Sequence, residues 1–155
     1  MTTTEKTTNN KRNIKYIVVH CTATPINTTI ESIKRYWKDV RGWGDHVGYH
    51  YIIEADGEVT QLLAENKNSN GVYAHNSECI NIAYIGGVDK AGKPKDTRTK
   101  SQQHAMFDLI VKLTETYKGA KVLGHRDFPN VAKACPCFDV KTWLANYTPD
   151  IEPNI

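Results

Sequence analysis

Short runs of β-branched and aromatic residues recur along the chain and predict the strands of a sheet. The first run, at residues 16–20, reads Tyr-Ile-Val-Val-His and predicts a buried strand that ends on a histidine. The Asp56-Gly57 pair favours a hairpin turn between two further strands. Those two strands and the remaining ones are predicted at residues 49–54, 59–63, 79–85 and 121–124.

A first helix is predicted between Thr28 and Gly42. Thr28 forms a capping-box pattern with Glu31, and Gly42 ends the helix. The apolar residues recur every three or four positions, as expected for one face of a helix: Ile30, Ile33, Trp37 and Val40.

Two more helices are predicted towards the C-terminal end. One begins at Thr99, which forms a capping-box pattern with Gln102, and ends at Gly119. Its apolar face consists of Met106, Leu109, Ile110, Leu113 and Tyr117. Asp139 caps a short last helix that runs through Leu144. Helices and strands therefore alternate, which predicts an α/β fold with a single mixed central sheet flanked by helices, in one domain.

The 155-residue chain is expected to contain one domain with a polar tail at each end. The first fifteen residues include five Thr and three Asn and almost nothing apolar, so residues 1–14 are predicted to be a disordered tail. The domain is placed at residues 15–147, with residues 148–155 as a C-terminal tail. No secretory signal and no membrane-spanning run of about 20 apolar residues is recognised, so we expect synthesis in the cytoplasm and no membrane partner.

Charge and cysteine content narrow the function classes. The net charge of +3 comes from 20 basic and 17 acidic residues that are scattered along the chain, which argues against nucleic-acid binding and weakly favours an anionic target. Four cysteines are too few to form a disulfide scaffold in a chain of this length, so free thiols or metal ligands are expected. These cysteines are Cys21, Cys79, Cys135 and Cys137.

Two histidines and a cysteine form a candidate metal site. His20 and His125 each end a predicted strand, and Cys135 follows His125 by ten residues. Two imidazoles and a thiolate suit zinc and leave a fourth tetrahedral position open, as in catalytic zinc sites. A histidine at a strand end is more often a surface or hydrogen-bonded residue, so this pattern alone leaves the metal site a hypothesis.

Several segments, in their order and spacing, resemble the N-acetylmuramoyl-L-alanine amidase type 2 family, which includes small phage amidases and animal peptidoglycan recognition proteins. They are Ile-Val-Val-His-Cys-Thr-Ala-Thr at 17–24, Val-Gly-Tyr-His-Tyr-Ile-Ile at 47–53, Gly-Gly-Val-Asp at 86–89 and Lys-Ala-Cys-Pro at 133–136. The overlapping segment at 135–143 also resembles the family. The resemblance implies that family's fold and hydrolysis of the amide between N-acetylmuramic acid and L-alanine in peptidoglycan.

The resemblance also implies roles for individual residues. His20, His125 and Cys135 match the zinc ligands, whereas Tyr49 and Lys133 match the catalytic tyrosine and lysine. Tyr49 would orient a water molecule or accept its proton, and Lys133 would stabilise an oxyanion. Without the resemblance, Tyr49 reads as a core aromatic residue and Lys133 as a solvated loop residue.

Other expectations are more open. His75 lies in a loop where related phage enzymes place a substrate-binding histidine, although the segment that follows it is shorter here. His50 is expected to support the structure, and Arg126 and Asp127 to order the loop that carries the ligand. Peptidoglycan is the expected partner of a monomer that acts on the cell wall after release or export. The alternatives are a non-catalytic peptidoglycan-binding module and an intracellular regulator that binds a polymerase.

Overall fold

The computed structural model describes residues 12–129, 131 and 133–149. Its central feature is a five-stranded sheet with the strand order β3-β2-β4-β1-β5. The strands are β1 (Tyr16–Cys21), β2 (Tyr51–Ile53), β3 (Val59–Gln61), β4 (Cys79–Tyr84) and β5 (Lys121–Gly124). Neighbouring strands are parallel except for the β2–β3 hairpin, which is antiparallel. The predicted α/β fold with one mixed sheet is confirmed.

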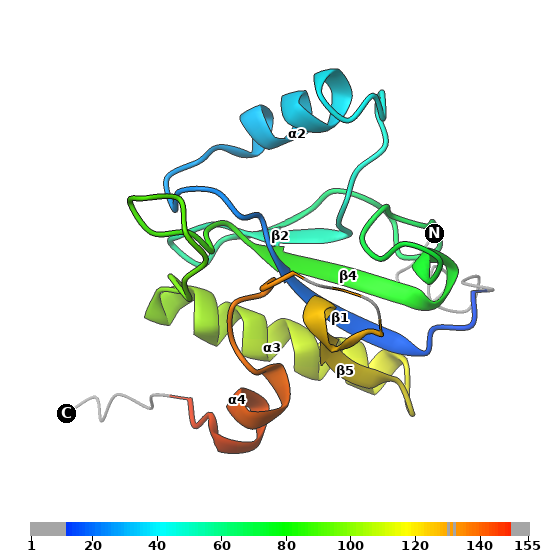
Figure 1. The fold of residues 1–155 in the computed structure, drawn as a ribbon. Coiled ribbons are helices and arrows are strands. Elements are labelled where there is room, and N and C mark those ends of the chain that lie inside the picture. The colour runs from blue at the N-terminus through cyan, green and yellow to red at the C-terminus, as the bar shows by residue number, and fades with distance from the viewer. Residues whose placement is uncertain (1–11, 130, 132, 150–155) are drawn as a thin grey trace.

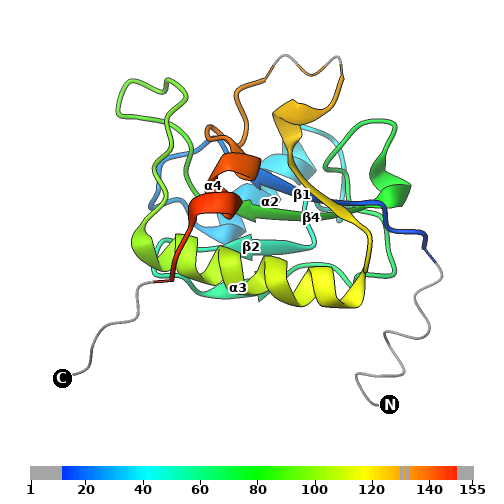
Figure 2. The same ribbon diagram turned by 90° about the horizontal axis from the view of Figure 1, so that it is seen from below.

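Helices cover both faces of the sheet. Helix α2 lies over one face and α3 over the other, so the domain has three layers (Figures 1 and 2). The helices are α2 (Ile30–Asp39), α3 (Lys100–Thr116) and α4 (Val140–Asn146), with 3-10 turns η1 (Asn76–Glu78) and η2 (His125–Asp127). The capping box of Thr99 with Gln102 and the cap at Asp139 are both present as predicted.

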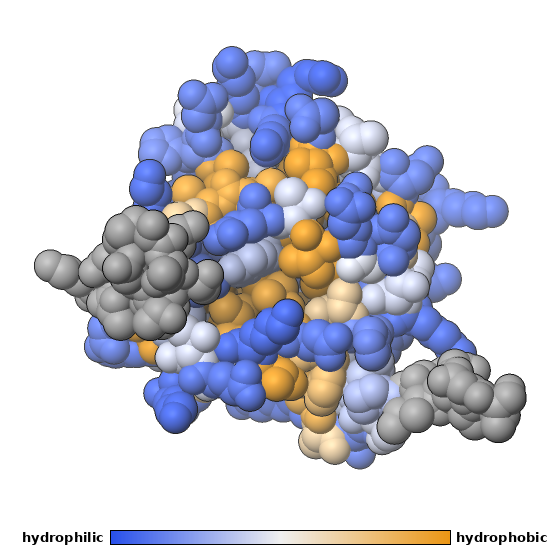
Figure 3. All heavy atoms as spheres, turned by 180° about the vertical axis from the view of Figure 1, so that it is seen from behind, coloured by the Kyte–Doolittle hydropathy of each residue, from blue (hydrophilic) through white to orange (hydrophobic). Residues whose placement is uncertain are grey.

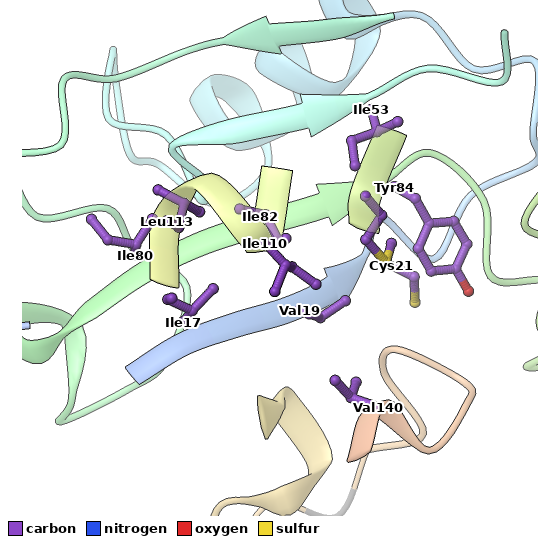
Figure 4. Packing of buried hydrophobic residues seen from close by; sticks show 11 residues of the cluster. Ile17, Val19, Cys21, Ile53, Ile80, Ile82, Tyr84, Ile110, Leu113 and Val140 are labelled. Atoms are coloured by element: carbon purple, nitrogen blue, oxygen red, sulfur yellow. The ribbon is translucent and has the colours of Figure 1, made fainter. Parts of the chain in front are cut away.

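The larger core lies between the sheet and α3. Because side chains alternate along a strand, Ile17, Val19 and Cys21 of β1 point to this side. They pack with Ile80, Ile82 and Tyr84 of β4 and with Met106, Ile110 and Leu113 of α3 (Figure 4). The same alternation turns Val18 and His20 of β1 to the opposite face, where α2 lies. His20, near the C-terminal end of β1, is therefore on the opposite side of the sheet from the main core.

Several details of the N-terminal half differ from prediction. Helix α2 begins one residue later than expected, because the Thr29 hydroxyl, and not that of Thr28, accepts a hydrogen bond from the Ser32 main chain. Val40 is 67% exposed, since it is the C-cap residue that follows the last helical turn. Strand β2 is also shorter than predicted, because the His50 carbonyl accepts hydrogen bonds from two successive residues of the next strand region, and this breaks the regular pairing.

Arg12, which the sequence analysis assigns to the N-terminal tail, is bonded to the body of the domain. Its guanidinium donates hydrogen bonds to the main-chain carbonyls of Glu65, Lys67, Asn76 and Cys79, at 2.7–2.8 Å. These contacts join two loops to the end of the sheet at which β4 begins. Residues 1–11 of the predicted N-terminal tail and 150–155 of the C-terminal tail lie outside the described residues.

The surface is mixed in character. In the view from behind, hydrophilic residues are spread over much of the face, and apolar residues are exposed between them (Figure 3). None of the described helices is long and apolar enough to span a membrane.

Candidate active site

The two candidate histidines lie side by side at one edge of the sheet. His20 is near the end of β1, and His125 directly follows β5 in the turn η2. The two strands are parallel neighbours, with Val19 opposite Gly124, so their C-terminal ends bring the rings to a centroid distance of 4.8 Å. The crevice at the C-terminal ends of parallel strands is where α/β proteins bind their ligands.

Cys135 completes a cluster of three possible metal ligands. The ligand atoms of His20, His125 and Cys135 all lie within 4.8 Å of one another, and the Cys135 sulfur is 3.9 Å from Nδ1 of His20. Two such atoms on one tetrahedral zinc ion are about 3.6 Å apart, given the usual Zn–N and Zn–S lengths. The spacing and the donor types of this cluster therefore fit a zinc ion with little adjustment.

The loop that carries Cys135 is fixed from several sides. The main-chain N–H of Arg126 donates to the Cys135 carbonyl at 2.9 Å, and the Tyr84 hydroxyl donates to the Pro136 carbonyl at 2.7 Å. The Asp127 carboxylate accepts from the Gly124 main chain at 2.8 Å and so holds the turn that carries His125. Arg126 and Asp127 thus order the ligand loops, as the sequence suggested.

Burial keeps the two histidines neutral, and local hydrogen bonds lower the pKa of the Cys135 thiol. Desolvation lowers the pKa of both His20 and His125 to about 4, so both rings are neutral at pH 7. A hydrogen bond from the Cys21 thiol lowers the pKa of Cys135, and the main-chain N–H of Cys21, 3.2 Å from the sulfur, acts in the same direction. The positive charge of Lys133 also favours the thiolate.

Tyr49 lies against the metal-ligand cluster. Its ring is 5.1 Å from that of His20, and its hydroxyl donates a hydrogen bond to the Cys21 carbonyl at 3.3 Å. Burial raises the pKa of Tyr49 well above its ordinary value, and the nearby Cys135 sulfur adds to the rise. The ring also packs on Trp37, so Tyr49 both supports α2 and faces the site.

A groove of about 780 Å³ contains the cluster. Tyr49 and Lys133 line it together with His20, His125 and Cys135, and Lys133 is exposed at its edge. The groove continues along α2 and the segment after it, where it is lined by Thr28, Ser32, Tyr36, Trp37, Arg41 and Trp43. Five of the residues predicted for catalysis or metal binding therefore share one solvent-accessible groove.

His75 lies elsewhere. Its ring packs against Tyr16 and Phe128, with centroid distances of 6.4 and 5.0 Å, and one ring nitrogen is 3.5 Å from the Glu78 carboxylate. Among the described residues, its neighbours Tyr73 and Asn76 line the groove but His75 does not. A role for His75 in substrate binding stays a prediction.

Asn81 is a residue of this site that the sequence analysis did not single out. It is fully buried in the middle of β4, and its side-chain oxygen is 2.8 Å from Nε2 of His20. A single amide within the otherwise apolar run Cys-Ile-Asn-Ile-Ala-Tyr is the available signal, because a buried amide must find hydrogen-bond partners. The sequence alone does not say that one partner is His20.

Comparisons with known proteins agree with this geometry. Residues 10–138 match the family described as N-acetylmuramoyl-L-alanine amidase. The endolysin of Escherichia phage T7 is 39% identical over 132 residues, which cover 82% of this chain and 83% of the relative. The endolysin of Klebsiella phage KP32 is 37% identical over 129 residues, with coverage of 82% and 83%.

Solved structures show the same fold. The endolysin of the Thermus scotoductus bacteriophage Ph2119 superposes with a TM-score of 0.70 at 28% identity, over 80% of this chain and 77% of that one. Drosophila PGRP-LB superposes with a TM-score of 0.68 at 19% identity, over 90% of this chain and 84% of that one. The arrangement of sheet and helices is therefore shared with both phage endolysins and PGRPs.

Proposed function

Because the chain belongs to the N-acetylmuramoyl-L-alanine amidase family, we propose that it is a zinc-dependent enzyme that cleaves the amide between N-acetylmuramic acid and L-alanine in peptidoglycan. Family membership makes it a peptidoglycan amide hydrolase. The zinc dependence and the residue roles are supported chiefly by one observation, the convergence of His20, His125 and Cys135 in a groove that also contains Tyr49 and Lys133.

His20, His125 and Cys135 would hold the zinc ion. Zinc bound by three protein ligands acidifies a water molecule to a pKa of about 7 and polarises a carbonyl group. Both histidines are neutral at pH 7 and Cys135 favours the thiolate, so the protein does not have to lose histidine protons to bind the metal. The single thiolate leaves the site with a net positive charge, which suits a developing oxyanion.

Lys133 and Tyr49 would act on the substrate directly. The Lys133 ammonium at the edge of the groove can approach the amide carbonyl oxygen and stabilise the negative charge that develops on it. Burial raises the pKa of the Tyr49 phenol and favours its protonated form, and we propose that it orients the attacking water by hydrogen bonding. The extended groove along α2 provides room for the glycan or the stem peptide on one side of the scissile bond.

Location and assembly follow from the same proposal. Phage endolysins are made in the cytoplasm and act on the cell wall, and we propose the same for this chain. A monomer that binds neither nucleic acid nor membrane is the expected form. A non-catalytic binding module is the less supported alternative, because the five side chains proposed for metal binding and catalysis all line one groove.

Mass spectrometry of digested peptidoglycan tests the proposal. Purified peptidoglycan incubated with the protein should yield glycan strands free of peptide and intact stem peptides that begin with L-alanine. Metal analysis of the protein should find about one zinc per chain, and prolonged chelation should abolish the release. Stem peptides that remain attached to muramic acid, or full activity in metal-free protein, would refute the bond or the zinc mechanism, respectively.

A further inference from the structure

Asn81 and His20 face each other across two neighbouring strands. β1 and β4 are parallel, with Val18 opposite Asn81 and His20 opposite Ala83, so His20 and Asn81 are diagonal neighbours. Both point away from the core on the α3 side, and both are almost completely buried, at 2% and 0% exposed. Their side chains meet in a hydrogen bond of 2.8 Å between Nε2 of His20 and Oδ1 of Asn81.

The orientation of the Asn81 amide, with Oδ1 towards His20 and Nδ2 towards Ser69, sets the direction of this hydrogen bond. The amide nitrogen Nδ2 of Asn81 donates to the Ser69 hydroxyl at 2.7 Å. The side-chain oxygen that faces His20 can only accept, so Nε2 of His20 must carry the proton. A neutral imidazole with its proton on Nε2 has its lone pair on Nδ1. Nδ1 is the nitrogen that lies 3.9 Å from the Cys135 sulfur.

Neighbouring groups hold the amide of Asn81 in place. A Cβ at Gly71 would lie 2.6 Å from both Nδ2 and Oδ1 of Asn81, so only glycine lets this loop pack against the amide. The main-chain N–H of Asn81 donates to Nδ1 of His50 at 3.0 Å, and Nε2 of His50 donates in turn to the Lys67 carbonyl at 2.7 Å. The side-chain amide is thus packed against a glycine, and the main chain of Asn81 is hydrogen-bonded to a second buried histidine.

We propose that Asn81 is a positioning residue, which fixes the tautomer and ring orientation of His20 so that Nδ1 is presented to the metal. The inference rests on the proposed zinc site and adds a residue to it. A hydrogen bond to the distal nitrogen of a ligating histidine commonly serves this purpose, and its loss typically weakens metal binding 10- to 100-fold. Here the partner is a neutral amide, which sets the tautomer without adding a negative charge.

Zinc affinity provides the first test. The dissociation constant of zinc is measured by competition with a chromophoric chelator for the wild type, Asn81→Leu and Asn81→Asp. Asn81→Leu removes the acceptor at similar volume and should bind zinc at least about tenfold more weakly. Asn81→Asp keeps an acceptor opposite His20, and the Ser69 hydroxyl can turn to donate to its other oxygen, so binding should recover to within a few-fold of wild type.

Gln102→Leu is the matched control. Gln102 is an equally buried amide, and its side-chain nitrogen donates to the carbonyls of Ile53 and Ile85, outside the groove. This variant should lose stability but bind zinc within about twofold of wild type, because none of its contacts reaches a ligand. A loss of affinity equal to that of Asn81→Leu would mean that any buried amide matters, and would overturn the proposal.

The tautomer of His20 is a second readout that needs no variant to fold. Long-range ¹H–¹⁵N spectra of the metal-free wild-type protein should show the proton of His20 on Nε2; a proton on Nδ1 would overturn the inference. If the wild type binds no zinc, the proposed function fails while the tautomer assignment can still hold. If the wild type binds zinc and Asn81→Leu binds it equally well, only the role of Asn81 fails.

Discussion

The sulfur of Cys137 lies 3.9 Å from that of Cys21. The sulfur of Cys135, only two residues away in sequence, lies 3.9 Å from Nδ1 of His20. The segment is a turn and not an extended strand: Cys137 has a φ of 74°, and its N–H donates to the Ala134 carbonyl at 2.6 Å. In an extended segment residues two apart point the same way, so such a segment would not distinguish the two thiols by geometry. In the turn, both sulfurs contact Cys21, but Cys135 also contacts His20, whereas Cys137 contacts the Gly87 carbonyl.

Serine substitutions should therefore separate the two cysteines. Cys135→Ser is expected to lose zinc and activity, because a hydroxyl is a far poorer zinc ligand than a thiolate. Cys137→Ser should keep both within a few-fold and serves as the matched control. Metal content and peptide release are measured on the same preparations. Zinc retained in Cys135→Ser but lost in Cys137→Ser would move the ligand to Cys137 and remove the basis for assigning Lys133.

Lys133→Ala should lower kcat by about a hundredfold, the usual cost of removing one oxyanion-stabilising group. Lys133 is exposed, so the free energy of unfolding should change by less than about 0.5 kcal/mol and zinc should stay bound. Kinetics on purified peptidoglycan and urea denaturation measure the two effects. Lys118→Ala, at an exposed lysine just after α3, is the control and should match wild type. Near-native turnover in Lys133→Ala would return Lys133 to an ordinary surface residue.

Tyr49→Phe removes only the hydroxyl that donates to the Cys21 carbonyl and leaves the ring packed on Trp37. We expect kcat to fall about tenfold or more while zinc content is unchanged, because general acid–base or orienting groups typically contribute factors of this order or larger. A pH profile distinguishes the two roles left open by the sequence. An orienting phenol leaves the shape of the profile unchanged on substitution, whereas loss of an ionisation from the profile would identify Tyr49 as the base.

Stability should fall as the pH is lowered from about 6.5 to 4. Desolvation lowers the pKa of His20 and His50 to about 4 in the folded protein, against about 6.5 in an unfolded chain. The unfolded chain therefore binds more protons in this window, and the free energy of unfolding drops by up to about 2.7 kcal/mol per pH unit from these two residues. Urea denaturation of metal-free protein between pH 7 and 5 measures the slope before most carboxylates titrate. A flat profile there would contradict the buried neutral histidines.

Arg12→Leu should destabilise the domain by about 2 kcal/mol, because hydrogen bonds to a charged group contribute about 1.5–3 kcal/mol and several carbonyls lose their donor. Arg12→Lys should recover part of this loss, since an ammonium cannot reach all the carbonyls together. Arg35→Ala, at an exposed residue of α2, is the control and should stay within about 0.5 kcal/mol of wild type. Equal stability of Arg12→Leu and wild type would show that the docked guanidinium contributes nothing net.

Sequence patterns predicted the elements of this fold better than the contacts between them. The run at residues 16–20 and the capping box at Thr99 depend on local preferences, and both are present in the structure. The convergence of His20 and His125 could also be foreseen, because both follow apolar strands and parallel strands end at one edge. The third proposed ligand, Cys135, was predicted because the Lys-Ala-Cys-Pro segment resembles a known family.

What escaped prediction depends on register and on rare backbone conformations. The pairing of Asn81 with His20 requires the alignment of two strands that are far apart in sequence, and it requires Gly71 to leave space for the amide. The φ of 74° at Cys137 is unusual for a residue with a side chain, so no local pattern indicates it. Arg12 was assigned to a tail because it lies in a polar stretch of the sequence. Its contacts are with loops that come together only in the folded domain.

The pairing of β1 with β5, a strand far along the sequence, has a consequence for synthesis on the ribosome. Cys135 follows His20 by 115 residues, and β1 pairs with β5, which also comes late in the sequence. At a synthesis rate of about 5–20 residues per second, the ribosome reaches the last ligand roughly 6 to 23 seconds after the first. A nascent chain that stops short of Cys135 cannot assemble the site. Each molecule should thus acquire the proposed activity only after residue 135 has been synthesised.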